Sequence, residues 1–203
     1  MIKKYLFSEN RGLRLSENFT LSEFVCADKS DEVLVSDELI ALLQRVRDHF
    51  GKPVIITSAY RTASHNKKVG GTSKSYHLTG EAADFVVSGI SPARVGYYLD
   101  KLGASGLGVY LSSGFVHLDV RSKGKWRGLI SSDKEENLSE YFPTLYKGKR
   151  GNSVRLLQTL LNVDADGIFG NQTREAVKKY QKENDLDVDA YVGPLTWSAL
   201  LDS

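Results

Sequence analysis

Two stretches of the chain decide its fold: Ser75-Tyr76-His77-Leu78-Thr79-Gly80-Glu81-Ala82-Ala83-Asp84 and, further on, Phe115-Val116-His117-Leu118-Asp119. They supply two histidines and an aspartate, which is the ligand set of a catalytic zinc site with one open coordination position. His117 lies 33 residues after Asp84, a spacing too wide for one helix or for a zinc-finger knuckle. Neighbouring strands of a sheet bring such distant residues together, so the spacing predicts ligands on adjacent strands.

The residues around these ligands have strand patterns. Residues 81–87 contain an apolar run, and residues 115–120 alternate, which places His117 and Asp119 on one face. A carboxylate such as Asp84 in a mostly apolar strand is costly unless it is paired or binds a metal. A lone histidine is more often a packed or surface residue, but three potential ligands together favour a metal site.

The pattern S-x-H-x-x-G-x-A-x-D with a later histidine resembles the zinc D-Ala-D-Ala peptidase family, which hydrolyses the peptide stems of bacterial cell walls. Three further segments match the family pattern, namely residues 58–62 (Ser-Ala-Tyr-Arg-Thr), 69–71 (Val-Gly-Gly) and 106–110 (Gly-Leu-Gly-Val-Tyr). The resemblance spans residues 19–127 and implies a small α+β zinc peptidase domain with a central antiparallel sheet. It also implies that His77, Asp84 and His117 bind one zinc ion per chain.

The resemblance assigns further roles. It places Arg61 where an arginine holds the substrate near the scissile carbonyl, and it places Ser75 beside the first ligand in the substrate cleft. Tyr110 belongs to the glycine-rich strand before the last ligand and is expected to contact substrate. A guanidinium can also stabilise an oxyanion or grip a carboxylate, whereas a surface arginine at a turn is the alternative interpretation of Arg61.

The general base is an open question at the level of sequence. Several relatives carry an acid three residues before the last histidine ligand, where this chain has Gly114, which cannot transfer a proton. Asp119 follows His117 by two residues and shares its strand face. Asp119 is therefore either the catalytic base or a partner that orients His117, and both remain open.

Composition limits the class of protein. The 203 residues are 41% hydrophobic, enough for true cores, and no stretch approaches the roughly 20 apolar residues of a membrane span. The first seven residues begin like a signal peptide, but polar residues 8–11 interrupt them. Cys26 is the single cysteine, which excludes an internal disulfide. We expect a protein made in the cytoplasm without a signal peptide, acting at the bacterial cell wall, with no membrane insertion.

Charge is unevenly distributed. Residues 1–130 hold 18 Lys and Arg against 13 Asp and Glu, whereas residues 131–203 hold 9 against 12. A mildly basic first part suits an anionic polymer such as a cell wall. The excess is too small and too dispersed to indicate a nucleic-acid partner. Composition also predicts the domains: a catalytic domain over 1–130, a polar linker over 131–143 and a second domain over 144–203.

The second domain contains an internal repeat with an offset of 23 residues. Gln158 and Asp166 correspond to Gln181 and Asp189, and each unit combines a turn with a following helix. Apolar residues at helical spacing before the first turn add another helix, so we expect an all-α three-helix domain. It resembles the three-helix peptidoglycan-binding module. A helical module for oligomerisation or folding is the alternative.

Together these features indicate a zinc metallopeptidase that cuts peptidoglycan stem peptides as a D,D-carboxypeptidase or endopeptidase, tethered to the wall by its second domain. The pattern is typical of a phage endolysin, released with a holin-type partner. One alternative is a catalytically silent wall-binding protein with a structural zinc. Another is a dipeptidase for free D-Ala-D-Ala, but a soluble dipeptide needs no tether.

Overall fold

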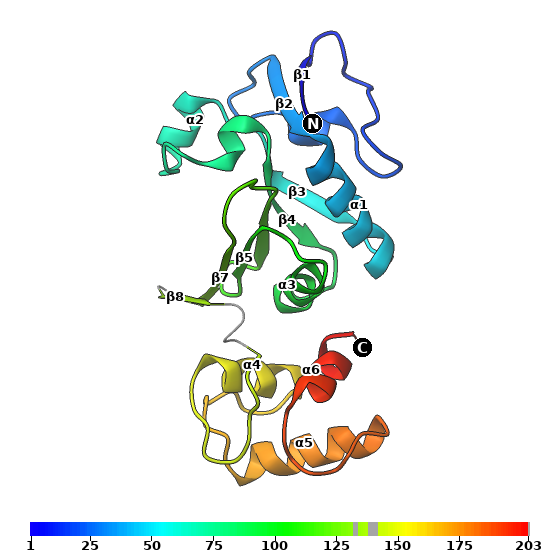
Figure 1. Cartoon of the computed structure of the whole chain (residues 1–203), viewed down its shortest axis with the longest axis vertical. Coiled ribbons are helices and arrows are strands. Elements are labelled where there is room, and N and C mark those ends of the chain that lie inside the picture. The colour runs from blue at the N-terminus through cyan, green and yellow to red at the C-terminus, as the bar shows by residue number, and fades with distance from the viewer. Residues whose placement is uncertain (132–133, 138–141, 203) are drawn as a thin grey trace. The chain divides into compact units, whose positions relative to one another are not determined.

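The computed structural model describes residues 1–131, 134–137 and 142–202. The chain divides into two compact units, Met1–Ser132 and Asp133–Ser203. The first combines helices with two sheets and the second is largely helical, so the predicted α+β class with a helical C-terminal part is confirmed (Figure 1). Of the proposed linker, residues 132–133 and 138–141 lie outside the described residues.

Five strands of the first unit form its main sheet: β3 (Val54–Ser58), β4 (Ala82–Val87), β5 (Gly106–Tyr110), β6 (Phe115–Asp119) and β7 (Trp126–Ser131). Their order is β3-β4-β6-β5-β7. Neighbours are antiparallel except β5 and β7, which are parallel. The turn between β5 and β6 requires a positive φ of 75° at Gly114, whose N–H bonds to the Tyr110 carbonyl at 2.8 Å.

The helical elements of this unit are α1 (Asp37–Phe50), α2 (Ala63–Lys68), α3 (Pro92–Lys101) and the short 3₁₀ helices η1 (Leu21–Phe24) and η2 (Tyr76–Thr79). The longest of these helices is α1, with 14 residues. Asp37 and Glu38 favour its positive N-terminal end, and Gly51 ends it in the left-handed conformation, with its N–H bonded to the Arg47 carbonyl.

The helices α1 and α3 pack against one face of the main sheet. Phe85 of β4, Val109 of β5 and Leu118 of β6 are fully buried, and α3 approaches so closely at Gly96 that a Cβ there would meet Val109. Side chains alternate along strands, so Asp84 and His117 lie on the opposite face. The apolar core therefore fixes which face carries the polar side chains.

A second sheet supports the segment that carries His77. It pairs β1 (Ile2–Leu6) antiparallel with β2 (Glu32–Ser36), a pairing that the sequence interpretation did not predict. The Ser36 N–H bonds to the Gly80 carbonyl at 2.9 Å. A Cβ at Gly80 would lie 2.2 Å from the Leu34 carbonyl oxygen, so this close approach requires glycine.

The second unit contains α4 (Asn152–Leu160), α5 (Asn171–Glu183) and α6 (Pro194–Asp202), and the short strand β8 (Lys134–Asn137) precedes them. Val154, Leu157, Val177, Trp197 and Leu201 are buried in its core. Among the described residues no helix combines the length and the apolar character needed to cross a bilayer.

The 23-residue repeat has a structural basis in two buried glutamines. The Gln158 amide donates to Asp166 at 2.8 Å, and its carbonyl accepts from the Gly167 N–H at 2.8 Å. Gln181 makes the same contacts, to Asp189 at 2.8 Å and from the Ala190 N–H at 2.9 Å. Each glutamine thus fastens a turn to the preceding helix, and this explains why the repeat preserves its spacing.

Candidate metal centre

Three elements bring His77, Asp84 and His117 together. His77 is buried in η2, Asp84 lies in β4 and His117 lies in β6. Asp84 and His117 are direct partners in the antiparallel register of β4 and β6, which brings together two residues that are distant in sequence. One potential ligand atom from each of the three residues lies within 4.8 Å of the others.

Hydrogen bonds fix the orientation of the His77 ring. Its Nδ1 lies 2.7 Å from the Ala59 carbonyl oxygen, which can only accept, so we assign the proton to Nδ1. The other nitrogen, Nε2, then presents a lone pair to the cluster. It lies 3.4 Å from Asp84 Oδ1 and 3.3 Å from His117 Nδ1.

His117 is held from both sides. Its Nδ1 lies 2.7 Å from Asp84 Oδ1, and its Nε2 lies 3.2 Å from Asp119 Oδ2. Asp119 is completely buried and also accepts from the Arg121 guanidinium, at 2.7 Å from Nε and 2.5 Å from Nη2. A proton on Nε2 donated to Asp119 leaves the Nδ1 lone pair facing Asp84 and His77.

The donor set fits a zinc ion. Three ligand atoms about 2.0–2.1 Å from a tetrahedral zinc lie about 3.3 Å from one another. The three separations here are 2.7, 3.3 and 3.4 Å. Two imidazole nitrogens and one carboxylate oxygen converge, and a cation at their centre would balance the charge of the carboxylate and accept the lone pairs of the two rings.

The electrostatics of the cluster follow from burial and pairing. Burial raises the pKa of Asp84, but hydrogen bonds and charge interactions with His117 and His77 outweigh it and hold that pKa below its ordinary range. Burial lowers the pKa of His117, and hydrogen bonds to Asp119 and Asp84 raise it above its ordinary value. Burial likewise raises the pKa of Asp119, whereas Arg121 and His117 together lower it to about 2.

Arg61 binds the outer side of the cluster. Its Nη2 donates to Asp84 Oδ2 at 2.5 Å and its Nε to Ser58 Oγ at 2.8 Å. Its backbone N–H also bonds to the His77 carbonyl at 2.9 Å. Arg61 therefore orients the Asp84 carboxylate. A contact with substrate stays a prediction.

Ser75 and Tyr110 lie beside the cluster. The Ser75 hydroxyl accepts from the His77 N–H at 3.4 Å and caps η2, and the Tyr110 ring stacks on Phe115 at 4.2 Å. Both line a hollow of about 430 Å³ together with His117. Their location is compatible with the expected substrate contacts, which stay predictions.

The hollow contains residues that the sequence interpretation missed. Lys74, Tyr76, Arg121 and Trp126 complete its wall with Thr72. Arg121 follows Asp119 by two residues, as Asp119 follows His117, so the strand period of two could have predicted that Arg121 shares their face. Trp126 carried no such signal because it depends on the parallel pairing of β5 with β7.

A second hollow of about 350 Å³ adjoins Arg61 and is also lined by Glu23, Tyr60 and His65. Asp84 binds Arg61 through Oδ2 and His117 through Oδ1. The first hollow is lined by His117 of the cluster, whereas the second is lined by Arg61, the partner of Asp84, and by none of the three cluster residues.

Comparison with known proteins places the two parts of the chain in families. The family model described as Peptidase M15 matches residues 17–119, and a model of a peptidoglycan binding domain matches residues 150–200. Among solved structures, part of the chain is similar to the Burkholderia AP3 phage endolysin at 41% identity. That match covers 29% of this chain and 24% of the other, with a TM-score of 0.28.

Curated proteins give the longest similarities. The chain is 30% identical over 128 residues to the peptidoglycan L,D-endopeptidase MepK of Escherichia coli (strain K12), covering 59% of this chain and 70% of MepK. It is 27% identical over 141 residues to the probable MepK of Haemophilus influenzae, covering 59% and 76%. The matching peptidase model spans half of the chain and includes all three residues of the cluster, so the chain belongs to the peptidase M15 family.

Proposed function

We propose that the chain is a zinc peptidase that hydrolyses a peptide bond in the stem peptides of peptidoglycan while its second unit holds it on the wall. The observation that carries the proposal is the convergence of ligand atoms from His77, Asp84 and His117, all within 4.8 Å of one another. The M15 membership and the names of the MepK relatives support the reaction and the substrate.

The residues of the site divide the work between holding a metal and orienting its ligands. His77, Asp84 and His117 would hold the zinc, which when bound acidifies a water molecule and polarises the scissile carbonyl. Ala59 fixes the His77 ring through its carbonyl, and Arg61 fixes the Asp84 carboxylate. The chain thus pre-arranges the ligands before any substrate binds.

We assign Asp119 the orienting role rather than that of general base. Its two oxygens already accept from His117 Nε2 and from two nitrogens of Arg121, and the carboxylate is fully buried. A pKa of about 2 also makes it a weak proton acceptor near neutral pH. The geometry supports a carboxylate that holds His117 in place.

Within this proposal we choose an endopeptidase rather than a carboxypeptidase. A carboxypeptidase needs room for one residue beyond the scissile bond, whereas an endopeptidase needs space on both sides. Here hollows of about 430 and 350 Å³ adjoin His117 and Arg61 respectively. The MepK relatives are named as endopeptidases, which supports the same choice.

The endolysin assignment belongs to the same proposal. In that role the protein would reach the wall with a holin-type partner and lyse the host from within. Expression with and without a co-expressed holin tests it, because an endolysin lowers culture turbidity only when the holin is present. Equal lysis in both cultures would contradict the holin requirement.

The experiment for the proposed activity combines metal analysis with mass spectrometry of fragments released from defined muropeptides. The wild-type chain should bind one zinc and release peptide fragments. His77→Ala should lose zinc binding and reduce turnover by well over the roughly 10- to 100-fold typical of an outer partner of a metal ligand. His49→Gln is the matched control, because His49 is a histidine outside the metal cluster. It lies in the last turn of α1, and its ring stacks on Tyr98 with centroids 3.8 Å apart. Zinc binding by the wild type without any turnover would favour the silent wall-binding alternative.

A further inference from the structure

The hollow beside His117 has a rigid aromatic and cationic wall. The guanidinium of Arg121 lies over the rings of Tyr76 and Trp126, 5.0 and 5.5 Å from their centroids. Its Nε and Nη2 donate to the buried Asp119. An arginine held by two rings and a carboxylate has little freedom, so this wall is fixed before a ligand arrives.

The strand β5 leaves room for that wall. A Cβ at Gly108 would lie 2.7 Å from the Trp126 ring, so the absence of a side chain there lets the indole approach the sheet. Trp126 also meets the His117 ring edge to face, with centroids 5.8 Å apart. The hollow is therefore built directly against a ligand of the proposed metal.

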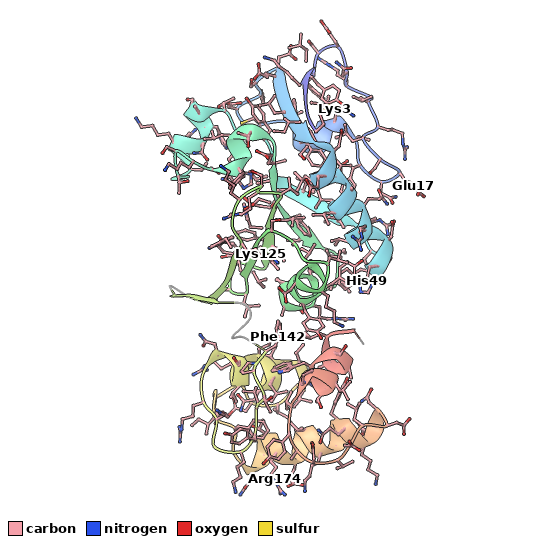
Figure 2. All side chains as sticks on the ribbon, in the orientation of Figure 1. Lys3, Glu17, His49, Lys125, Phe142 and Arg174 are labelled. Atoms are coloured by element: carbon pink, nitrogen blue, oxygen red, sulfur yellow. The ribbon has the colours of Figure 1, made fainter. Side chains whose placement is uncertain are left out.

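The charge of the hollow is positive. Lys74 and Arg121 line it, and Asp119 is the only acid among its nine described lining residues. Asp119 compensates the charge of Arg121. Lys74 is exposed and has no ion-pair partner in the described part of the chain. Lys123 and Lys125 are exposed in the following loop, where Figure 2 labels Lys125.

We propose that this hollow binds a carboxylate of the stem peptide, with Lys74 as the cation that selects it. The inference rests on the proposed function and names what the site recognises beside the scissile bond. Peptidoglycan stems offer carboxylates of two kinds, a branch carboxylate of a D-glutamate or diamino acid and the free end of the stem. Either carboxylate would balance the unpaired charge of Lys74, while the apolar atoms of the stem peptide would contact the aromatic wall.

Binding of uncleavable stem-peptide analogues, with a reduced amide at the scissile bond, tests the inference by calorimetry on the zinc-loaded full chain. Three analogues are compared: one with both carboxylates free, one amidated at the branch and one amidated at the end. We expect one amidation to raise the Kd about 5- to 20-fold, and its position identifies the source. Lys74→Met should abolish the preference and Lys74→Arg should retain it.

The control is Lys52→Met, which removes an exposed lysine from the turn before β3 and should keep the preference. Equal Kd values for all three analogues, or a preference that persists in Lys74→Met, would overturn the inference. Binding is measured without hydrolysis, so the proposed function is judged separately. It fails if the cleavable parent peptide is not hydrolysed, whatever the analogues show.

Discussion

His117 occupies a position where both ring nitrogens have acidic neighbours, Asp84 at 2.7 Å and Asp119 at 3.2 Å. In the metal-free chain this environment raises its pKa, despite burial, so a proton and a metal compete for the same ring. Two carboxylates stabilise whichever cation is present. Metal binding should therefore weaken as the pH falls, because the ligand nitrogen must lose its proton first.

Asp119→Asn should distinguish orientation from general-base catalysis. If Asp119 orients His117, the substitution should weaken zinc affinity about 10- to 100-fold, while turnover at saturating zinc changes much less. Competition with a chelator gives the affinity, and initial rates at saturating zinc give the turnover. A fall in turnover of about 10²–10⁴ with unchanged zinc affinity would instead identify Asp119 as the base.

The acid sensitivity of the metal-free chain should depend on Asp119. Its pKa is lowered on folding from 3.8 to about 2, so its ionised form stabilises the folded state. That contribution is complete at pH values above 3.8, the pKa of Asp119 in the unfolded chain, and it is lost as the pH falls through about 2. Urea midpoints of the wild type and Asp119→Asn should therefore converge between pH 4 and pH 2. A constant difference across that range would show that Asp119 does not titrate with folding.

At the scale of elements, the sequence predicts what depends on local pattern. The strand alternation around His117 and the apolar run around Asp84 predicted adjacent strands, and the register of β4 and β6 pairs these two residues directly. Gly51 ends α1 in the left-handed conformation, as helix-end chemistry predicts, whereas Ser36 precedes the helix without a side-chain capping bond. The ligand set was predicted from two short stretches of sequence, whereas the class of fold followed from the family resemblance over residues 19–127.

The features that the sequence did not predict depend on pairing between distant segments. The β1–β2 sheet joins residues about 30 positions apart, and the sequence of its first strand alone indicates only an interrupted signal-like start. The parallel pairing of β5 and β7 brings Trp126 to the site, and no local pattern encodes a parallel register. The aromatic wall therefore required the three-dimensional structure.

Gly106→Ala tests how tightly β5 supports the site. A Cβ at Gly106 would lie 2.1 Å from the carboxylate atoms of Asp119, which Arg121 and His117 hold in place. We expect a loss of about 1–3 kcal/mol in the free energy of unfolding, as for other overpacked sites, together with weaker zinc binding. Gly12→Ala is the control, because nothing lies within 4 Å of its Cβ. Equal urea midpoints for the two variants would contradict the close packing.

At the scale of the whole molecule, each compact unit has its own core. The first unit places its apolar residues between the main sheet and the helices α1 and α3, and the metal cluster lies on the other face of that sheet. The second unit closes three helices around Trp197 and fastens its two turns with Gln158 and Gln181. None of the cluster residues comes from the second unit, so catalysis and wall attachment are separable in the proposed mechanism.

Truncation after Ser132 tests this separation. The remaining chain keeps every residue of the metal cluster and of both hollows beside it, so kcat/KM for a small soluble stem peptide should stay within about twofold. Turnover of intact walls should fall about tenfold or more, because a second binding unit raises the effective concentration of enzyme at an insoluble substrate. Release of soluble fragments from purified walls, compared with hydrolysis of the small peptide, measures both effects. Circular dichroism confirms that the truncated chain is folded. Equal losses on both substrates in a folded truncated chain would show that the second unit completes the catalytic fold instead of tethering it.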